Sequence, residues 1–257
     1  MELSVPASLL AAGAVSVALA VIHVFSGVLR RLPAPERAVG SFAGGISVAY
    51  VFLHLLPEIA TGNQGVAEAL DDVVTETPLV ELALFAVALT GFAVMYALEH
   101  LGRRDGEARA RTGGGRSSAL LYRAHLGAFA LYNVLITYSM PLRFRTGVLF
   151  ALLFAVAMAL HFLLTDRGLS EHYPDRFGRS SRLVLAGALV VGLLLAAAAA
   201  PTRTLTVSVL TALLGGAVLL NVFKEELPSS GRSSMPWFLV GLGVYGVLLA
   251  AVTAAEG

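Results

Sequence analysis

The sequence predicts an all-α integral membrane protein with eight transmembrane helices. Of its 257 residues, 57% are hydrophobic and only 14% are charged, whereas soluble domains carry about 25% charged residues. The apolar residues come in runs of roughly 20, the length that a helix needs to cross a hydrocarbon core of about 30 Å. Because backbone polar groups find no water in lipid, each run is expected to be a helix.

Eight spans follow from these runs, and together they form one transmembrane domain, 1–257. They cover residues 6–29, 40–60, 78–101, 119–141, 147–168, 182–200, 205–224 and 236–254. The first run is longer than the apolar core of a signal peptide, so it is expected to be a retained helix. The segment 102–118 is rich in arginine and glycine and lacks apolar periodicity, which indicates a flexible cytoplasmic linker.

Basic residues divide unevenly between the two sides of the predicted bundle. If both termini lie outside, fifteen of the eighteen lysines and arginines fall on the cytoplasmic side, as the positive-inside rule requires. Arginine is nearly the sole basic residue, and alanine, glycine and leucine dominate, which indicates a prokaryotic source. The expected location is therefore the prokaryotic cytoplasmic membrane.

The sequence GGISVAYVFLHLLP at 44–57 has a counterpart, GGAVLLNVFKEELP, at 215–228, with six identities in fourteen positions. In the topology above, these two helices cross the membrane in opposite directions. This pattern predicts an inverted repeat that relates 1–101 to 182–257 around a central helix pair at 119–168. Small residues that let helices approach closely are the alternative explanation for the shared glycines.

Polar residues follow both copies of this motif, at opposite ends of the bundle. His54 and Glu58 are expected at the outer mouth, and Glu225 and Glu226 at the inner one. We interpret them as an entrance or gate for a cationic or protonated substrate, with ordinary interfacial positions as the alternative. The prolines that follow, at 57 and 228, are expected to end their helices.

These segments resemble the ZIP family of divalent metal transporters, the zinc- and iron-regulated transporter-like proteins. SFAGGISVAYVFLHLLPE at 41–58 is similar to the family's second helix, and GFAVMYALEHL at 91–101 to its third. The motif at 215–228 and PWFLVGLGVYGVLLA at 236–250 resemble its seventh and eighth helices. The resemblance implies a 3+2+3 inverted-repeat bundle with both termini outside and a divalent metal such as zinc as transported substrate. It leaves a homodimer open.

The resemblance is weaker in the helices with which the family holds its metal. HLGAFALYNVLITYS at 125–139 places Asn133 where the family has an acid, and HFLLTDRG at 161–168 keeps only His161 and Asp166 of the family's ligands. The family's two-metal site is therefore incomplete, and His161 and Asn133 are the remaining, doubtful metal ligands. Asp166 lies about 140° around the helix from His161, beside Arg167, with which it is expected to form an ion pair.

Two pairs of polar residues one turn apart lie on the central helices: Asn133 with Thr137, and His161 with Thr165. With Asp166 they form either a polar substrate pathway or a set of hydrogen bonds that lock the two helices together. His23 is expected to pack or to form a satisfied hydrogen bond. Tyr50, Tyr132, Tyr138 and Tyr245, together with Glu99, are interpreted as interfacial anchors.

The function indicated is a ZIP-like membrane transporter for a divalent metal cation or another small solute, through a reduced polar site between helices four and five. The alternative is a non-transporting relative with a structural, regulatory or partner-binding role. An enzyme is not expected, because His161 and Asp166 face apart and no nucleophile motif accompanies them. The chain has no cysteine, which excludes disulfides and thiolate metal sites, and no P-loop, Rossmann or nucleic-acid motif. The expected partners are the lipid bilayer and a divalent cation, with no nucleic acid and no resident cofactor.

Overall fold

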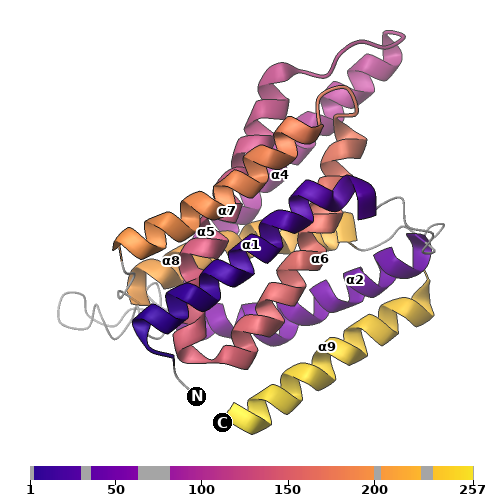
Figure 1. The fold of residues 1–257 in the computed structure, drawn as a ribbon. Helices are drawn as coiled ribbons and strands as arrows, with labels where there is room; N and C mark the ends of the chain where they lie inside the picture. The colour runs from indigo at the N-terminus through magenta and orange to yellow at the C-terminus, as the bar shows by residue number, and fades with distance from the viewer. Residues whose placement is uncertain (1–2, 30–35, 63–81, 200–203, 227–233, 257) are drawn as a thin grey trace.

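The structure is a computed structural model that describes residues 3–29, 36–62, 82–199, 204–226 and 234–256 (Figure 1). Eight helices in these ranges are long and apolar enough to cross a membrane, which confirms the predicted all-α membrane protein. The elements, with η for π-helix, are α1 Val5–Leu29, α2 Glu36–Tyr50, η1 Val51–Leu55, α4 Ala83–Arg111, α5 Ala119–Thr146, α6 Val148–His172, α7 Arg179–Ala199, α8 Thr204–Asn221, η2 Val222–Glu226 and α9 Met235–Glu256.

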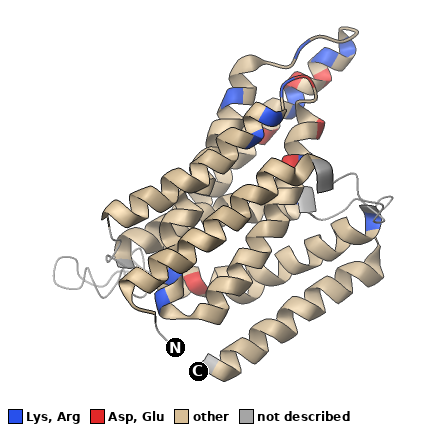
Figure 2. Ribbon diagram, viewed as in Figure 1, with Lys and Arg blue, Asp and Glu red and all other residues tan. Residues whose placement is uncertain are grey.

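Successive spans run in opposite directions, so both chain termini lie at one end of the bundle (Figure 1). We call this end the terminal end. The opposite end carries the connections at 112–118 and 173–178, and we call it the loop end. Lysine and arginine gather mainly toward the loop end (Figure 2).

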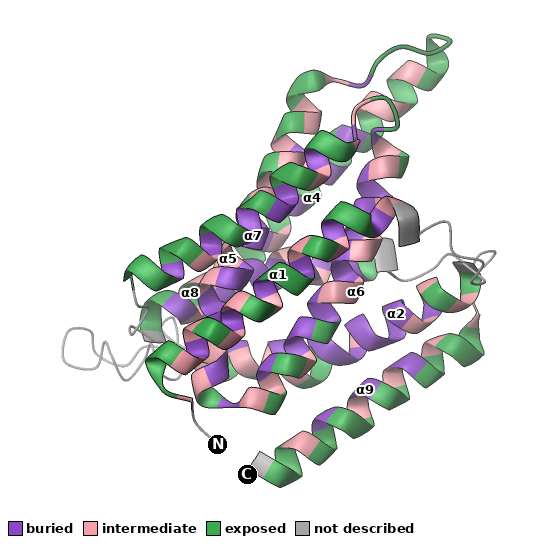
Figure 3. Ribbon diagram, viewed as in Figure 1, coloured by how far each residue is buried: buried purple, intermediate pink, exposed green. Residues whose placement is uncertain are grey.

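The outer faces of the helices are apolar and exposed, as lipid contact requires (Figure 3). Leu10 and Leu120 are each 77% exposed, and Val247 is 70% exposed. In water such a continuous apolar surface would promote aggregation, but in a bilayer it matches the hydrocarbon. The burial pattern therefore agrees with an integral membrane protein.

Glycines allow the closest helix crossings. The three most extensive helix pairs are α2 with α9, α4 with α8, and α5 with α7. A Cβ on Gly45 would lie 2.1 Å from the carbonyl oxygen of Phe238, and a Cβ on Gly216 would lie 1.7 Å from that of Ala88. Only glycine lets these backbones touch, so each crossing depends on it.

The proline at 57 does not end its helix, contrary to the prediction. The span continues from Arg37 to Gly62, and the π-helical turn η1 lies just before the proline, with the amide of Leu56 bonded to the carbonyl of Val51. A π turn widens the helix where proline lacks an N–H and crowds the preceding turn. The second π turn, η2, occupies the equivalent positions, 171 residues later. Pro228 lies outside the described residues.

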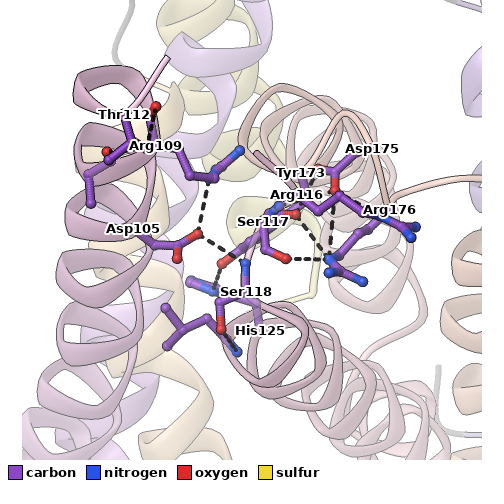
Figure 4. Close-up of polar contacts among 12 residues, drawn as sticks. Asp105, Arg109, Thr112, Arg116, Ser117, Ser118, His125, Tyr173, Asp175 and Arg176 are labelled. Atoms are coloured by element: carbon purple, nitrogen blue, oxygen red, sulfur yellow. Dashed lines mark hydrogen bonds and ion pairs between the residues drawn. The ribbon is translucent and has the colours of Figure 1, made fainter. Parts of the chain in front are cut away.

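The segment expected to be a flexible linker is partly helical and partly fastened to the bundle. Helix α4 continues through Arg111. Beyond it, Asp175 accepts hydrogen bonds from the backbone amide of Ser117 (3.1 Å) and from its hydroxyl (2.7 Å), and Arg176 donates to the Ser117 carbonyl. Figure 4 shows these contacts together with the hydrogen bond from the Ser118 amide to Asp105. We call this group of residues the loop-end clasp.

Candidate functional site

A cavity of about 470 Å³ hollows the bundle at its terminal end. The spans that contain α2, α5, α6, α8 and α9 all contribute to its walls. Its polar lining residues are His54, Glu58, Thr61, Arg143, Thr146, Ser208, Thr211 and Thr253. The predicted outer-mouth residues His54 and Glu58 therefore do line one cavity.

An ion pair between Glu58 and Arg143 occupies the wall of this cavity. Nη1 of Arg143 donates to Oε2 of Glu58 at 2.9 Å, and the guanidinium lies 4.1 Å from the ring centroid of Phe154. The Arg143 side chain is only 11% exposed, whereas Glu58 is 33% exposed. Nε2 of His54 lies 3.8 Å from the same Glu58 oxygen. The ionisable lining groups are these three, so one fixed positive charge and one carboxylate balance each other.

Local helix geometry brings Glu58 and Arg143 together. Because the helix continues past the π turn, Glu58 remains on a helical face instead of entering a loop. Helix α5 likewise continues past Pro141 to Thr146, whereas the prediction ended that span at residue 141. Arg143 therefore lies on the last turn of a helix, where its side chain reaches across to Phe154.

Aromatic side chains lie beneath the ion pair. The Tyr50 ring centroid lies 5.9 Å from that of Phe154 and 6.3 Å from that of Tyr245, and Tyr50 is 2% exposed. Tyr132 is buried as well. The prediction that these tyrosines anchor the interface is wrong for Tyr50, Tyr132 and Tyr245, because close helix packing directs their rings into the bundle. They separate the cavity from the other end of the interior.

A second, much smaller pocket of about 20 Å³ lies at the loop end. Glu99 lies in its wall and accepts a charge-assisted hydrogen bond from Lys224. Nε2 of His172 lies 3.6 Å from the other Glu99 oxygen. Glu99 was predicted as an interfacial anchor, but it is buried, because α4 and α8 cross closely enough to bring Lys224 onto it. The loop end is therefore closed by charged groups from three helices.

Asn133 and Thr137 fasten α5 to α7. The amide nitrogen of Asn133 donates to the carbonyl of Leu185 at 3.0 Å, and the Thr137 hydroxyl donates to the carbonyl of Leu189 at 2.8 Å. Asn133 Nδ2 also lies 2.9 Å from Nε2 of His23 on α1. These polar groups act as interhelical hydrogen bonds, in the sense of the second reading given for them above, although the helices that they join are α5, α7 and α1.

Asp166 is paired with α1 and not with Arg167. Its Oδ1 lies 3.0 Å from Nδ1 of His23, and its Oδ2 accepts from the hydroxyl of Ser26 at 2.5 Å. Arg167 instead donates to Glu171 at 2.8 Å. The expected pair was wrong, because successive helical residues point about 100° apart. Since Asn133 donates to Nε2, the proton of His23 belongs on Nδ1, and a neutral imidazole then donates to the carboxylate.

His161 and Thr165 face a different part of the interior from Asn133 and Thr137. The His161 ring lies 5.4 Å from that of Tyr132 on α5, and its Nε2 lies 3.4 Å from the Thr165 hydroxyl. Thr165 lines the loop-end pocket. The hydrogen bonds described here therefore divide the predicted pathway residues between an α1–α5–α7 network and the loop-end side of α6.

The described residues contain no group of three or more histidine, aspartate or glutamate side chains that could hold a metal ion. Of the two doubtful metal ligands, Asn133 uses its amide as a donor, and His161 contacts Thr165 and aromatic rings. Glu225 and Glu226 form the end of η2, but their side chains lie outside the described part of the chain. Their role as an inner gate stays a prediction.

Arg143 is the site residue that the sequence reasoning passed over, although a signal for it was present. It is one of three basic residues on the side that the positive-inside rule leaves poor in arginine. An arginine that departs from this rule near a helix end is a candidate for a role inside the bundle. His23 carried a weaker signal, because a polar residue within a long apolar run usually faces other helices.

Comparison with known proteins assigns no family to the chain. No protein-family model matches the sequence, and no curated protein matches it either.

Proposed function

We propose that this protein is a ZIP-like permease that moves a small polar solute across the membrane by exchanging which end of its interior is open. In this proposal, residues 1–101 and 182–257 form an inverted repeat around the central helices. The solute pathway follows the helices that line the two pockets. It runs from the terminal-end cavity past His161 and Thr165 to the loop-end pocket.

The exchanged glycine contacts carry the proposal. Gly45 of the α2 span packs on Phe238 of α9, and Gly216 of α8 packs on Ala88 of α4. The first members of these two contacts are 171 residues apart, and the second members, at 238 and 88, are 150 apart. The reciprocal contacts keep both offsets, since Gly241 packs on Phe42 and Gly91 packs on Leu213. Two halves that pack on each other by the same contacts can adopt two states of similar energy.

The two π turns support the same relation. Val51–Leu55 and Val222–Glu226 are offset by the 171 residues that separate the repeated motifs. π turns are rare and often occur at functional sites. A pair at equivalent positions of oppositely directed helices favours a repeat over a chance similarity of small residues.

The orientation of the chain comes from its charges. The arginine-rich loop end suits the cytoplasmic side, so the cavity at the terminal end faces outward. This proposal keeps both termini outside. The open cavity at one end and the ion-paired pocket at the other fit a permease in its outward-facing state.

Unsatisfied polar groups inside the bundle also favour a pathway. Within the described residues, Ser47 Oγ, Asn221 Nδ2, Thr211 Oγ1 and Tyr245 Oη are buried and have no hydrogen-bond partner. Each such group costs about 1–3 kcal/mol. A purely structural bundle gains nothing from that cost, whereas a pathway needs polar groups that pair with a passing solute.

The interior is less suited to a divalent cation than to other polar solutes. A cation beside Glu58 would also lie beside the Arg143 guanidinium. At about 4 Å and an effective dielectric constant of about 20, two unit charges repel by roughly 4 kcal/mol, and a divalent ion doubles this value. The metal-transport version of the proposal therefore requires Arg143 to move away first.

Cysteine labelling tests the proposal, because the native chain has no cysteine. Asn221 lines the loop-end pocket and is 4% exposed, so a cysteine there reacts only when that end opens. We expect Asn221→Cys in membrane vesicles to react with an impermeant maleimide from the cytoplasmic side. Leu189→Cys, at a fully buried position off the pathway, serves as the matched control and should stay unreacted.

A non-transporting relative is the competing function, and the hydrogen bonds of Asn133 and Thr137 that lock α5 to α7 favour it. A locked bundle would protect Asn221→Cys as fully as Leu189→Cys over hours. That result would reject the permease.

A further inference from the structure

Resting on the proposed permease function, we propose that the terminal-end cavity binds a small zwitterion. The carboxylate of the solute pairs with Arg143, and its ammonium group pairs with Glu58. The cavity would then distinguish an amino-acid-like solute from simple anions, simple amines and metal ions.

The charges of the cavity set this preference. Its ionisable lining groups are His54, Glu58 and Arg143, and the last two are already paired at 2.9 Å. A carboxylate ligand that took Arg143 alone would leave Glu58 uncompensated, and an amine or metal ion that took Glu58 alone would leave Arg143 uncompensated. An uncompensated charge in a partly buried site is costly. A zwitterion replaces both partners at once and keeps the site neutral.

The donors of Arg143 suit a carboxylate. A guanidinium has five N–H groups in a planar fork that matches a carboxylate. The recorded hydrogen bond to Glu58 uses Nη1, and Phe154 lies against the face of the group, which leaves its edge for a ligand. Nε of Arg143 is buried without a hydrogen-bond partner in the described part of the chain, and so is the hydroxyl of Thr211 in the same wall.

The size and the lining of the cavity suit a small aliphatic solute. Its volume of about 470 Å³ lies within the usual range for small-molecule sites. Leu53, Phe150 and Leu249 provide apolar surface, and Ser208 provides a hydroxyl. A short carbon chain can lie on the apolar side while both charged ends reach the ion pair.

Protection of a single cysteine tests the proposal directly. Ser208 lines the cavity, so Ser208→Cys reports on its occupancy. Alanine, propionate and ethylamine make a matched series, because propionate lacks only the ammonium group and ethylamine lacks only the carboxylate. We expect alanine, γ-aminobutyrate or glycine betaine to slow the maleimide reaction in a saturable way, and propionate, ethylamine and Zn²⁺ to leave it unchanged. Equal protection by propionate or Zn²⁺, or no protection by any of the three zwitterions, would overturn the proposal.

Variants of the ion pair give a second test, one that a merely structural ion pair would not satisfy. Glu58→Gln leaves Arg143 unpaired, so protection by the zwitterion should weaken about 10- to 100-fold and protection by propionate should appear. Arg143→Gln should abolish protection by both. Arg145→Gln is the matched control on the same helix, outside the cavity lining, and should behave as the native chain. A Glu58→Gln protein that binds the zwitterion unchanged would refute the assignment of Glu58.

These outcomes are separable from the test of the permease. Zwitterion protection of Ser208→Cys together with an unreactive Asn221→Cys would leave a binding protein that does not transport. Reactive Asn221→Cys with no zwitterion protection would leave a permease for another class of solute.

Discussion

The glycine crossings give a prediction whose size follows from the structure. In Gly216→Ala the new Cβ would lie 1.7 Å from the Ala88 carbonyl oxygen, and in Gly45→Ala it would lie 2.1 Å from the Phe238 carbonyl oxygen. An ordinary contact begins near 3.4 Å, so each helix pair must separate by more than about 1 Å. Overpacking of this kind costs about 1–3 kcal/mol.

Thermal unfolding in detergent micelles measures this cost. For a chain of this size, it corresponds to a lowering of Tm on the order of 2–12 °C, and the repeat requires similar losses from both variants. Gly187→Ala is the control, since no atom lies within 4 Å of the added Cβ and alanine favours the helix. If one crossing variant lost stability and the other did not, the two halves would not share one packing scheme.

Three further predictions concern the charged groups. His23→Ala leaves the Asp166 carboxylate, which is 1% exposed, without its imidazole partner, so the free energy of unfolding should fall by about 3–5 kcal/mol in equilibrium denaturation in detergent; an unchanged stability would contradict the pairing. Glu99→Gln weakens the closure of the loop end, so a buried pocket cysteine at position 221 should react faster with maleimide than in the parent cysteine variant, and a slower reaction would count against a gate. The hydroxyl of Ser117 lowers the pKa of Asp175 below its ordinary value of 3.8, so this carboxylate stabilises the loop-end clasp above that pH and the contribution is lost as the pH falls through the lowered value. Asp175→Asn should therefore increase tryptic cleavage of the adjoining 112–118 segment at neutral pH, and unaltered cleavage would show that other contacts hold it.

The architecture was predictable because lipid imposes simple requirements on a sequence. A run such as 147–168 is apolar and long enough to span, and the observed helix Val148–His172 contains nearly all of it. Helix ends were harder to place, because a proline reads as a stop in the sequence. The continuation past residue 57 depends on a π turn, which local propensity does not indicate.

The site was less predictable, since its contacts join residues distant in sequence. Glu58 and Arg143 are 85 residues apart, and His23 and Asp166 are 143 apart. Spacing within one helix predicted that Asn133 and Thr137 share a face, which holds, because both donate to α7. It did not predict which helix that face meets, because crossing angles and rotation depend on the packing of the whole bundle.

Distances across the two ends of the bundle test the central claim of alternating access most directly. Spin labels at Thr61 and Thr146 report on the terminal end, and labels at His100 and Glu171 report on the loop end; all four positions are exposed. Pulsed electron–electron resonance in nanodiscs should show two distance populations for each pair, and conditions that shorten one distance should lengthen the other. A single narrow distance at both ends, unchanged by solute or pH, would contradict the account.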